Sequence, residues 1–393
     1  MEPLGSHQLS PEGVIEFLVE APLDIHQRNS ARRRFYHIVE HFGAGGATDN
    51  SVPPQYEPPR LIRCTYEYAL SDESRDNFLR AFFRAMTLSL TTSQDNDNDN
   101  DNDLSDLEHI RPLFFNFAAY LLDNFFLPIK ASANKTPQLS PVFRSAGERV
   151  QGGAQGFVGT PDRLSQLRGA CLVRDRHRCV ITRYFDHKEA RDRMRRNGDD
   201  ARDDDGALLL EDTVIDKLKV AHILPHFLTK VDVGCELNPS KQAALAILNM
   251  FDTGVLHLID GTDIDRPRNA VTLTAFLHTL FDDFQVFFEP IPDEKPHTYR
   301  IETFYDRRLM RNLSFLMTRT LYLTDDRLID PPSPRLLAVH RAIAYILRLS
   351  GAGEYIDNII RDCEEESIRA DGSTDLDRIL RLSLGGWLNK PVY

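Results

Sequence analysis

The sequence predicts an α+β fold in which a central segment containing strands lies between two largely helical segments. Apolar residues recur at helical spacing in residues 73–90 and again in residues 334–351. Between them, residues 270–274 and 284–290 are short apolar runs with the length and composition of strands. We therefore expect three parts: a helical region over residues 1–150, a mixed domain over 160–300 and a helical region over 301–393.

Length and composition are those of a globular intracellular protein. The 393 residues are more than one hydrophobic core usually holds, and 41% hydrophobic and 27% charged residues are ordinary proportions. The acidic amino terminus lacks the apolar core of a secretory signal, and Asn and Asp interrupt the apolar residues 113–129, so we expect no membrane span. Five scattered cysteines form no disulfide pattern, which favours the nucleus or cytoplasm.

The amino-terminal region predicts helices at residues 10–20, 73–90 and 107–126, and a proline-punctuated, extended connector after the last of them. An Asp/Asn repeat over residues 93–106 separates two of these helices. Its alternating aspartates resemble a calcium loop, but Asn102 stands where the sharp turn needs glycine. Because a repetitive polar tract has nothing apolar to bury, we interpret it as a disordered loop.

The central domain begins with a basic helix and an apolar run, Cys179–Thr182, that we expect to be a strand. From Asp162 to Arg196 there are eleven Lys and Arg against five Asp and Glu, although the whole chain carries a net charge of −12. The stretch HKEARDRMRR predicts an exposed helix whose arginines contact phosphates. Its alternative interpretation is a solvated face paired with neighbouring acids. The candidate phosphate-binding residues are Arg191, Arg193, Arg195 and Arg196.

Two histidines and an asparagine stand out around the predicted strands. His222 ends the strand in KVAHILPH, and Asn269 directly precedes the strand AVTLT. Thr274 is a plausible helix cap, which places His278 one turn into the following helix. Asp282 lies four residues further on the same helical face. Each of these side chains also has a purely structural interpretation, as a packed histidine, a turn asparagine or a helix-end carboxylate.

This pattern resembles the HNH nuclease family. The segments AHILP, IDRPRNAVTL and LHTLF carry the resemblance, and the three signature residues correspond to His222, Asn269 and His278. The chain looks most similar to HNH-domain proteins of fungi, over roughly residues 75–365, with the motifs at about 165–290. The resemblance implies a ββα-metal domain embedded between the helical regions.

The resemblance also implies a metal-dependent endonuclease that hydrolyses phosphodiester bonds in nucleic acid, with DNA favoured over RNA. His222 would be the general base, because a histidine has its pKa near working pH. Asn269 would orient the hairpin that carries His222. His278 would bind one divalent ion, which could be Mg, Mn, Ni or Zn.

One position departs from the family pattern. Many HNH enzymes carry Asp or His immediately before the base, as a second metal ligand, but this chain has Ala221. We expect Asp282, or else His226, to supply the missing ligand beside His278. If neither does, the domain is a degenerate module that binds nucleic acid or a protein partner without cutting. A third hypothesis is a helical interaction protein in which the flanking segments matter most.

Overall fold

The computed structural model describes most of the chain. Its ranges are residues 21–44, 56–90, 107–133, 160–210, 213–229, 239–306, 308, 318–324, 328–364, 375–384 and 387. The helix expected at residues 10–20 and the Asp/Asn loop at 93–106 lie outside them. The chain forms two compact units, each assembled from separate stretches of sequence, so they do not follow the linear division expected above. Unit 1 comprises Met1–Pro128, Cys235–Gly254 and Tyr345–Gly386, and unit 2 comprises Ile129–Gly234, Val255–Ala344 and Trp387–Tyr393.

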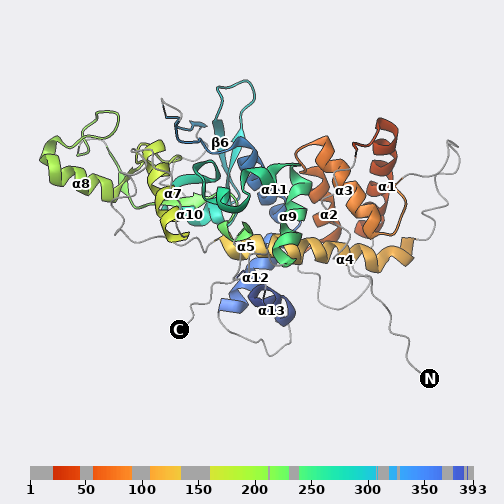
Figure 1. The fold of residues 1–393 in the computed structure, drawn as a ribbon. Coiled ribbons are helices and arrows are strands. Elements are labelled where there is room, and N and C mark those ends of the chain that lie inside the picture. The colour runs from red at the N-terminus through yellow and green to blue at the C-terminus, as the bar shows by residue number, and fades with distance from the viewer. Residues whose placement is uncertain are drawn as a thin grey trace. The chain divides into compact units, whose positions relative to one another are not determined.

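Unit 1 is helical in its described residues. Helices α1 to α4 pack against one another (Figure 1), and buried phenylalanines fill the space between them. Phe82 contacts Phe35 and Phe117 in edge-on ring arrangements, so the helical spacing in residues 73–90 marks core positions. The helices are α1 (Ile25–Ala44), α2 (Pro58–Glu67), α3 (Asp72–Ala85), η3 (Leu107–Ile110), α4 (Arg111–Leu121), η4 (Leu122–Phe126), α9 (Pro239–Phe251), α12 (Ala352–Glu364) and α13 (Leu376–Leu384).

The helix expected to end at residue 126 continues further, as α5 (Leu127–Ala133), so the prediction of an extended connector was wrong for residues 127–133. The rest of the predicted connector lies outside the described residues. Pro128 lacks an N–H and would ordinarily interrupt the α-helical hydrogen-bond ladder. The five residues of η4 instead form a π-helical turn, in which Leu127 N–H bonds to Leu122 C=O. This wider turn changes the bonding register next to the proline and lets the chain continue as helix.

One helical stretch, Leu107–Ser132, is long and apolar enough to cross a membrane by length and composition alone. Its most apolar window is 61% buried inside the structure, and core helices of soluble proteins meet the same criterion. The stretch is therefore weak support for a membrane span.

Unit 2 contains the strands and short helices around them. Strands β1 and β2 pair in parallel, strands β3 and β4 pair antiparallel, and β5, β6 and β7 form an antiparallel meander. Its elements are α7 (Thr160–Arg174), β1 (Phe185–Asp186), α8 (His187–Asn197), η5 (Gly198–Asp200), β2 (Ile215–Asp216), β3 (Leu218–His222), η6 (His226–Thr229), η7 (Val255–Leu258), η8 (Gly261–Asp265), η9 (Pro267–Asn269), β4 (Ala270–Thr274), α10 (Ala275–Asp282), β5 (Val286–Pro290), β6 (Thr298–Thr303), β7 (Thr318–Thr320) and the first part of α11 (Pro334–Leu349).

The sequence predicts β4 and β5 correctly, and the α+β class is confirmed. Two expectations were wrong. Residues 179–182 form a turn, closed by a bond from Arg183 N–H to Cys179 C=O, and Val180 N–H reaches across to Thr272 C=O. The apolar run therefore packs on β4 as a buried loop. The second error concerns β7, which lies beyond residue 300 in the part expected to be helical.

Candidate active site

Strands β3 and β4 and helix α10 form one ββα unit. The strands pair antiparallel with Leu218 opposite Thr274 and His222 opposite Ala270, and α10 packs on both. The Thr274 side chain accepts a hydrogen bond from Leu277 N–H, so the predicted helix cap is confirmed. This cap starts α10 directly after β4, one turn before His278. The unit thus brings two sequence-distant histidines into one small structure.

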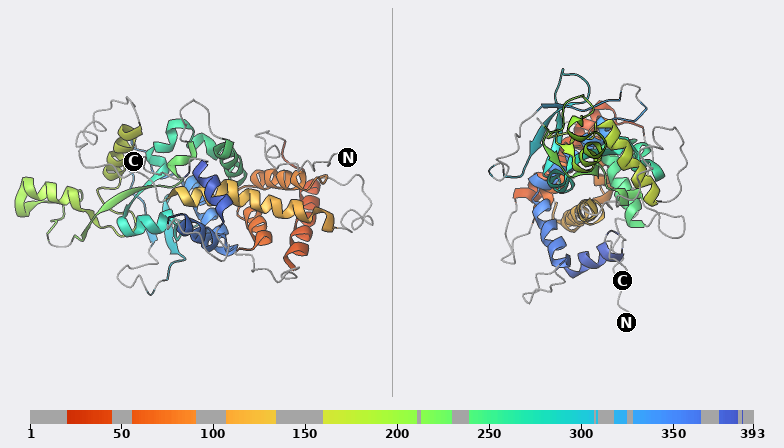
Figure 2. Two further views of the ribbon diagram at one scale, coloured as in Figure 1. Left: turned by 90° about the horizontal axis from the view of Figure 1, so that it is seen from below. Right: turned by 90° about the vertical axis from the view of Figure 1, so that its left-hand side faces the viewer.

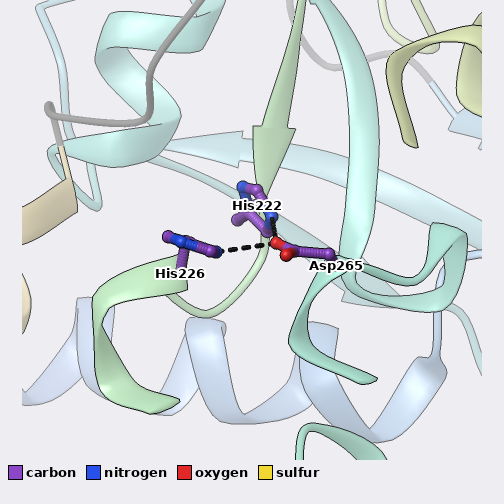
Figure 3. A group of neighbouring side chains, drawn as sticks. All are labelled: His222, His226 and Asp265. Carbon is purple, nitrogen blue, oxygen red and sulfur yellow. Dashed lines mark hydrogen bonds and ion pairs between the residues drawn. The ribbon is translucent and has the colours of Figure 1, made fainter. Parts of the chain in front are cut away.

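His222 lies at the end of β3 and joins a buried cluster. His222 Nε2 is 3.1 Å from Asp265 Oδ1, and His226 Nδ1 is 2.7 Å from the same oxygen. Figure 3 shows both imidazoles pointing at the Asp265 carboxylate, which ends η8. All three residues expose no more than 5% of their surface. His222 Nδ1 is buried and has no hydrogen-bond partner among the described residues.

Asp265 is the charged centre of this cluster. Its second oxygen, Oδ2, accepts a hydrogen bond of 3.2 Å from Arg163 Nε on α7. Burial opposes ionisation of Asp265, but hydrogen bonds from the two imidazoles outweigh it, so the pKa of the carboxyl is lowered. Burial also lowers the pKa of His222, and its bond to Asp265 only partly offsets this. The cluster therefore contains a carboxylate and a neutral His222 at neutral pH.

Asn269 is fully buried and connects two loops. Its Oδ1 accepts a hydrogen bond from Leu224 N–H at 2.9 Å, and its Nδ2 donates to Leu224 C=O at 3.0 Å and to Ile264 C=O at 2.9 Å. The Asn269 main chain also accepts a bond from Ile223 N–H. The side chain thus fixes the backbone that follows His222 and the backbone that precedes Asp265.

His278 and Asp282 form a second buried pair, one turn apart on α10. His278 Nδ1 lies 3.1 Å from Asp282 Oδ2, within ion-pair distance, but the two atoms are not aligned for a hydrogen bond, and Oδ2 has no hydrogen-bond partner in the described part of the chain. Burial, with the nearby charge of Lys219, lowers the pKa of His278 to about 4. Burial and the neighbouring Asp283 raise the pKa of Asp282 well above its usual value. An oxygen and a nitrogen 3 Å apart, both buried, fit two ligands of one cation.

The two parts of the site influence each other. Positive charge on His222 would repel positive charge on His278 and so lower the pKa of His278. The two imidazoles are therefore close enough to interact electrostatically. The charge of Lys219, on β3, contributes to the lowered pKa of His278 and only partly opposes the raised pKa of Asp282. His226 contacts Asp265, and its ring is tilted against that of His222 with centroids 5.7 Å apart, so these contacts of His226 are to the His222 side of the site.

The basic segment forms helix α8, but its arginines differ. Arg193 bonds to Glu189 and Asp204, and Arg196 bonds to Asp192 C=O. Arg191 and Arg195 are exposed and have no partner among the described residues. In Figure 1 and in the left view of Figure 2, where α8 is yellow-green, the helix stands at one end of unit 2, away from α10. The alternative interpretation, charge paired with local acids, therefore holds for Arg193 and also for Arg196, whose guanidinium lies 3.7 Å from Glu189 Oε1.

Comparison with known protein families identifies the same segment. Residues 179–289 match the family model of HNH endonucleases. The matched segment contains β3, β4 and α10 with His222, Asn269 and His278. The chain thus carries an HNH-family domain in its middle, flanked by helical segments. No curated protein and no solved structure matches the chain.

The sequence interpretation missed Asp265 and Arg163. Asp265 lies in GTDIDRPRN, where two aspartates and two arginines suggest a surface turn. In the structure Asp263 takes both of those arginines as ion-pair partners, which leaves Asp265 to turn inward. The one available signal was the position of Asp265, four residues before the signature asparagine.

Proposed function

We propose that the chain is a metal-dependent endonuclease that hydrolyses phosphodiester bonds in DNA. The observation that carries the proposal is the ββα unit itself. It lies inside the segment that matches the HNH family, with His222 at the end of β3, Asn269 in η9 directly before β4, and His278 on α10. HNH nucleases generally use a divalent metal, and the His278–Asp282 pair offers a buried nitrogen and an unsatisfied oxygen for it.

His222 is the proposed general base. Because its pKa is lowered, the imidazole is neutral at physiological pH and can accept the proton of an attacking water. Asn269 keeps this imidazole in place by fixing Leu224, two residues further along the chain. When bound by His278 and Asp282, a divalent ion would supply positive charge that stabilises the phosphate in the transition state.

Nicking of supercoiled plasmid tests the proposal, with Mg²⁺, Mn²⁺, Ni²⁺ and Zn²⁺ in separate reactions. We expect cleavage by the wild type and a loss of roughly 10² to 10⁴ in rate for His222→Ala, the range for removal of a general base. His278→Ala should also lose activity, and excess cation should partly restore it. His257→Ala is the matched control, because His257 is exposed on η7 in the same unit. Equal cleavage by all variants would assign the nicking to a contaminant.

A second candidate function is a module that binds nucleic acid without cutting it. Two observations favour it. Ala221 stands beside His222 and cannot bind a metal, and the site residues are nearly closed to solvent. Binding to a short DNA duplex at low salt, with no nicking under any of the four metals, would establish this alternative over the first.

A further inference from the structure

Asp265 joins two histidines through a single oxygen. Both His222 Nε2 and His226 Nδ1 lie within hydrogen-bond distance of Oδ1. An ionised carboxylate can only accept hydrogen bonds, so both nitrogens must carry their protons. A neutral imidazole has one N–H, which leaves His222 Nδ1 as an unprotonated acceptor. That atom is buried and has no hydrogen-bond partner among the residues that the structure describes.

We propose that Asp265 is the positioning residue of this site: it holds the His222 proton on Nε2 and so makes Nδ1 the atom that accepts the proton of water. The catalytic part rests on the proposed nuclease function, whereas the position of the proton on the ring does not. In the reaction the water O–H bond breaks and the proton moves to Nδ1. The water oxygen bonds to phosphorus, and a bridging P–O bond breaks to release the leaving oxygen. Asp265 stabilises the imidazolium that forms.

The surroundings of Asp265 make it a fixed acceptor. Arg163 holds Oδ2, so the carboxylate cannot rotate away from the histidines. Asn269 holds the preceding residue through Ile264 C=O. Arg163 also balances the charge of the carboxylate. Together with the two imidazoles it gives the Asp265 carboxylate three hydrogen-bond donors, two on Oδ1 and one on Oδ2. Hydrogen bonds alone therefore satisfy the Asp265 carboxylate, so the contacts among the three side chains do not require a cation.

The same network predicts an unusual form of His226. Its Nδ1 is the atom that faces Asp265 Oδ1, so its neutral ring carries the proton on Nδ1 and leaves Nε2 unprotonated. The two histidines of one cluster are thus expected in opposite tautomers, His222 protonated on Nε2 and His226 on Nδ1.

Nuclear magnetic resonance of the full chain tests this directly, using ¹⁵N-histidine and long-range ¹H–¹⁵N correlation at pH 8. His222→Ala and His226→Ala spectra assign the two rings. We expect opposite tautomers in the wild type. A proton on Nδ1 of His222 would overturn the proposal, as would Zn²⁺-induced coordination shifts at both His222 Nε2 and His226 Nδ1, which would make the cluster a metal site.

Asp265→Asn is the decisive variant. Arg163 requires an oxygen, so the new amide should present its NH₂ group to the histidines and force the His222 proton onto Nδ1. Asp263→Asn is the matched control: Asp263 lies in the same η8 helix but pairs with Arg266 and Arg268, and its loss should leave both tautomers unchanged. An unaltered His222 pattern in Asp265→Asn would contradict the assignment. If that variant does not fold, the wild-type spectrum still decides.

Activity provides a separate readout. Asp265→Asn should cut plasmid at least about 10²-fold more slowly than Asp263→Asn. It should also shift the rate–pH profile, because the imidazolium loses its carboxylate, whereas Asp265→Glu should recover part of the rate. A wild-type protein with opposite tautomers but no cleavage would disprove the nuclease function and leave the Asp265 assignment standing. Cleavage with unchanged profiles in Asp265→Asn would overturn the positioning role alone.

Discussion

At the level of single residues, burial favours the neutral form of each ionisable side chain in the candidate site, and only Asp265 among those described there has hydrogen bonds that outweigh it. Asp282 is the clearest case, because a carboxyl with a raised pKa and an unsatisfied oxygen is held beside His278. We predict that His278→Ala and Asp282→Ala each weaken binding of Mn²⁺ by at least about tenfold, because loss of a ligand should cost no less than loss of a group that only orients a ligand, which costs about 10- to 100-fold. His222→Ala should bind the metal nearly as the wild type does. Isothermal titration calorimetry measures all three, and loss of binding in His222→Ala alone would reverse the assignment of base and ligand.

His340 gives a residue-scale prediction outside the site. Its ring stacks on Phe281 with centroids 4.0 Å apart, and its Nε2 hydrogen-bonds to Phe281 C=O. Burial lowers the pKa of His340 from 6.5 to about 4, so the unfolded chain binds the extra proton first. The stabilising effect of the neutral ring is present above pH 6.5 and is lost as pH falls towards 4, by about 3 kcal/mol in total.

His340→Gln keeps a donor for Phe281 C=O but does not titrate. Denaturant unfolding between pH 7 and pH 4 should therefore show a shallower loss of unfolding free energy in this variant. His37→Gln, at an exposed position on α1, is the control and should follow the wild type. Parallel curves for the wild type and His340→Gln would contradict the prediction.

The sequence predicts the residues of the site unevenly. His222, Asn269 and His278 could be chosen as candidates because the family motif has fixed residue types next to predictable strands. Asp265 could not be chosen over Asp263 because both are aspartates in the same polar turn, and only the fold determines which faces the histidines. Buried polar partners of this kind depend on contacts over forty residues or more, such as Asp265 with His222.

At the level of elements, α8 shows how local ion pairing selects the residues that can bind phosphate. Arg193 is already neutralised by Glu189 and Asp204. We predict that Arg191→Gln with Arg195→Gln lowers the slope of log affinity for DNA against log salt by about 2, one phosphate contact for each arginine. Arg193→Gln, the control, should change the slope little. Fluorescence anisotropy from 50 to 300 mM salt measures it, and an unchanged slope in the double variant would remove α8 from the DNA surface.

Helix ends were predicted correctly where the sequence carries a clear capping residue or a terminating glycine. Thr274 begins α10 as the cap rule predicts, and Gly351 ends α11 with a positive φ of 73°. The interpretation failed at Pro128 because a π-helical turn, which has no sequence signature, accommodates the proline. It failed at residues 179–182 because a short apolar run is equally suited to a strand or to a buried loop.

At the level of the whole molecule, the linear domains expected from the sequence differ from the compact units. Helix α9 lies inside the segment that matches the HNH family, yet it belongs to unit 1. There it packs on α3 and η4, and Phe251 stacks on Phe125. Sequence patterns cannot predict that α9 belongs to unit 1. Amphipathic spacing shows that one face of a helix is buried, but not which element covers it.

This interleaving predicts that the fragment of residues 160–300 does not fold as an independent domain. Without unit 1, the buried face of α9, which includes Ala244, Ile247, Leu248 and Phe251, would be exposed, at about 1.5–3 kcal/mol for each large side chain. The fragment also lacks His340, whose ring covers Phe281, and Arg341, which forms an ion pair with Glu289. We expect the full chain to unfold cooperatively by circular dichroism on heating, whereas the fragment should show no sharp transition and should bind a hydrophobic dye. A cooperative transition in the fragment would show that the HNH segment is self-sufficient and that α9 contributes little to its stability.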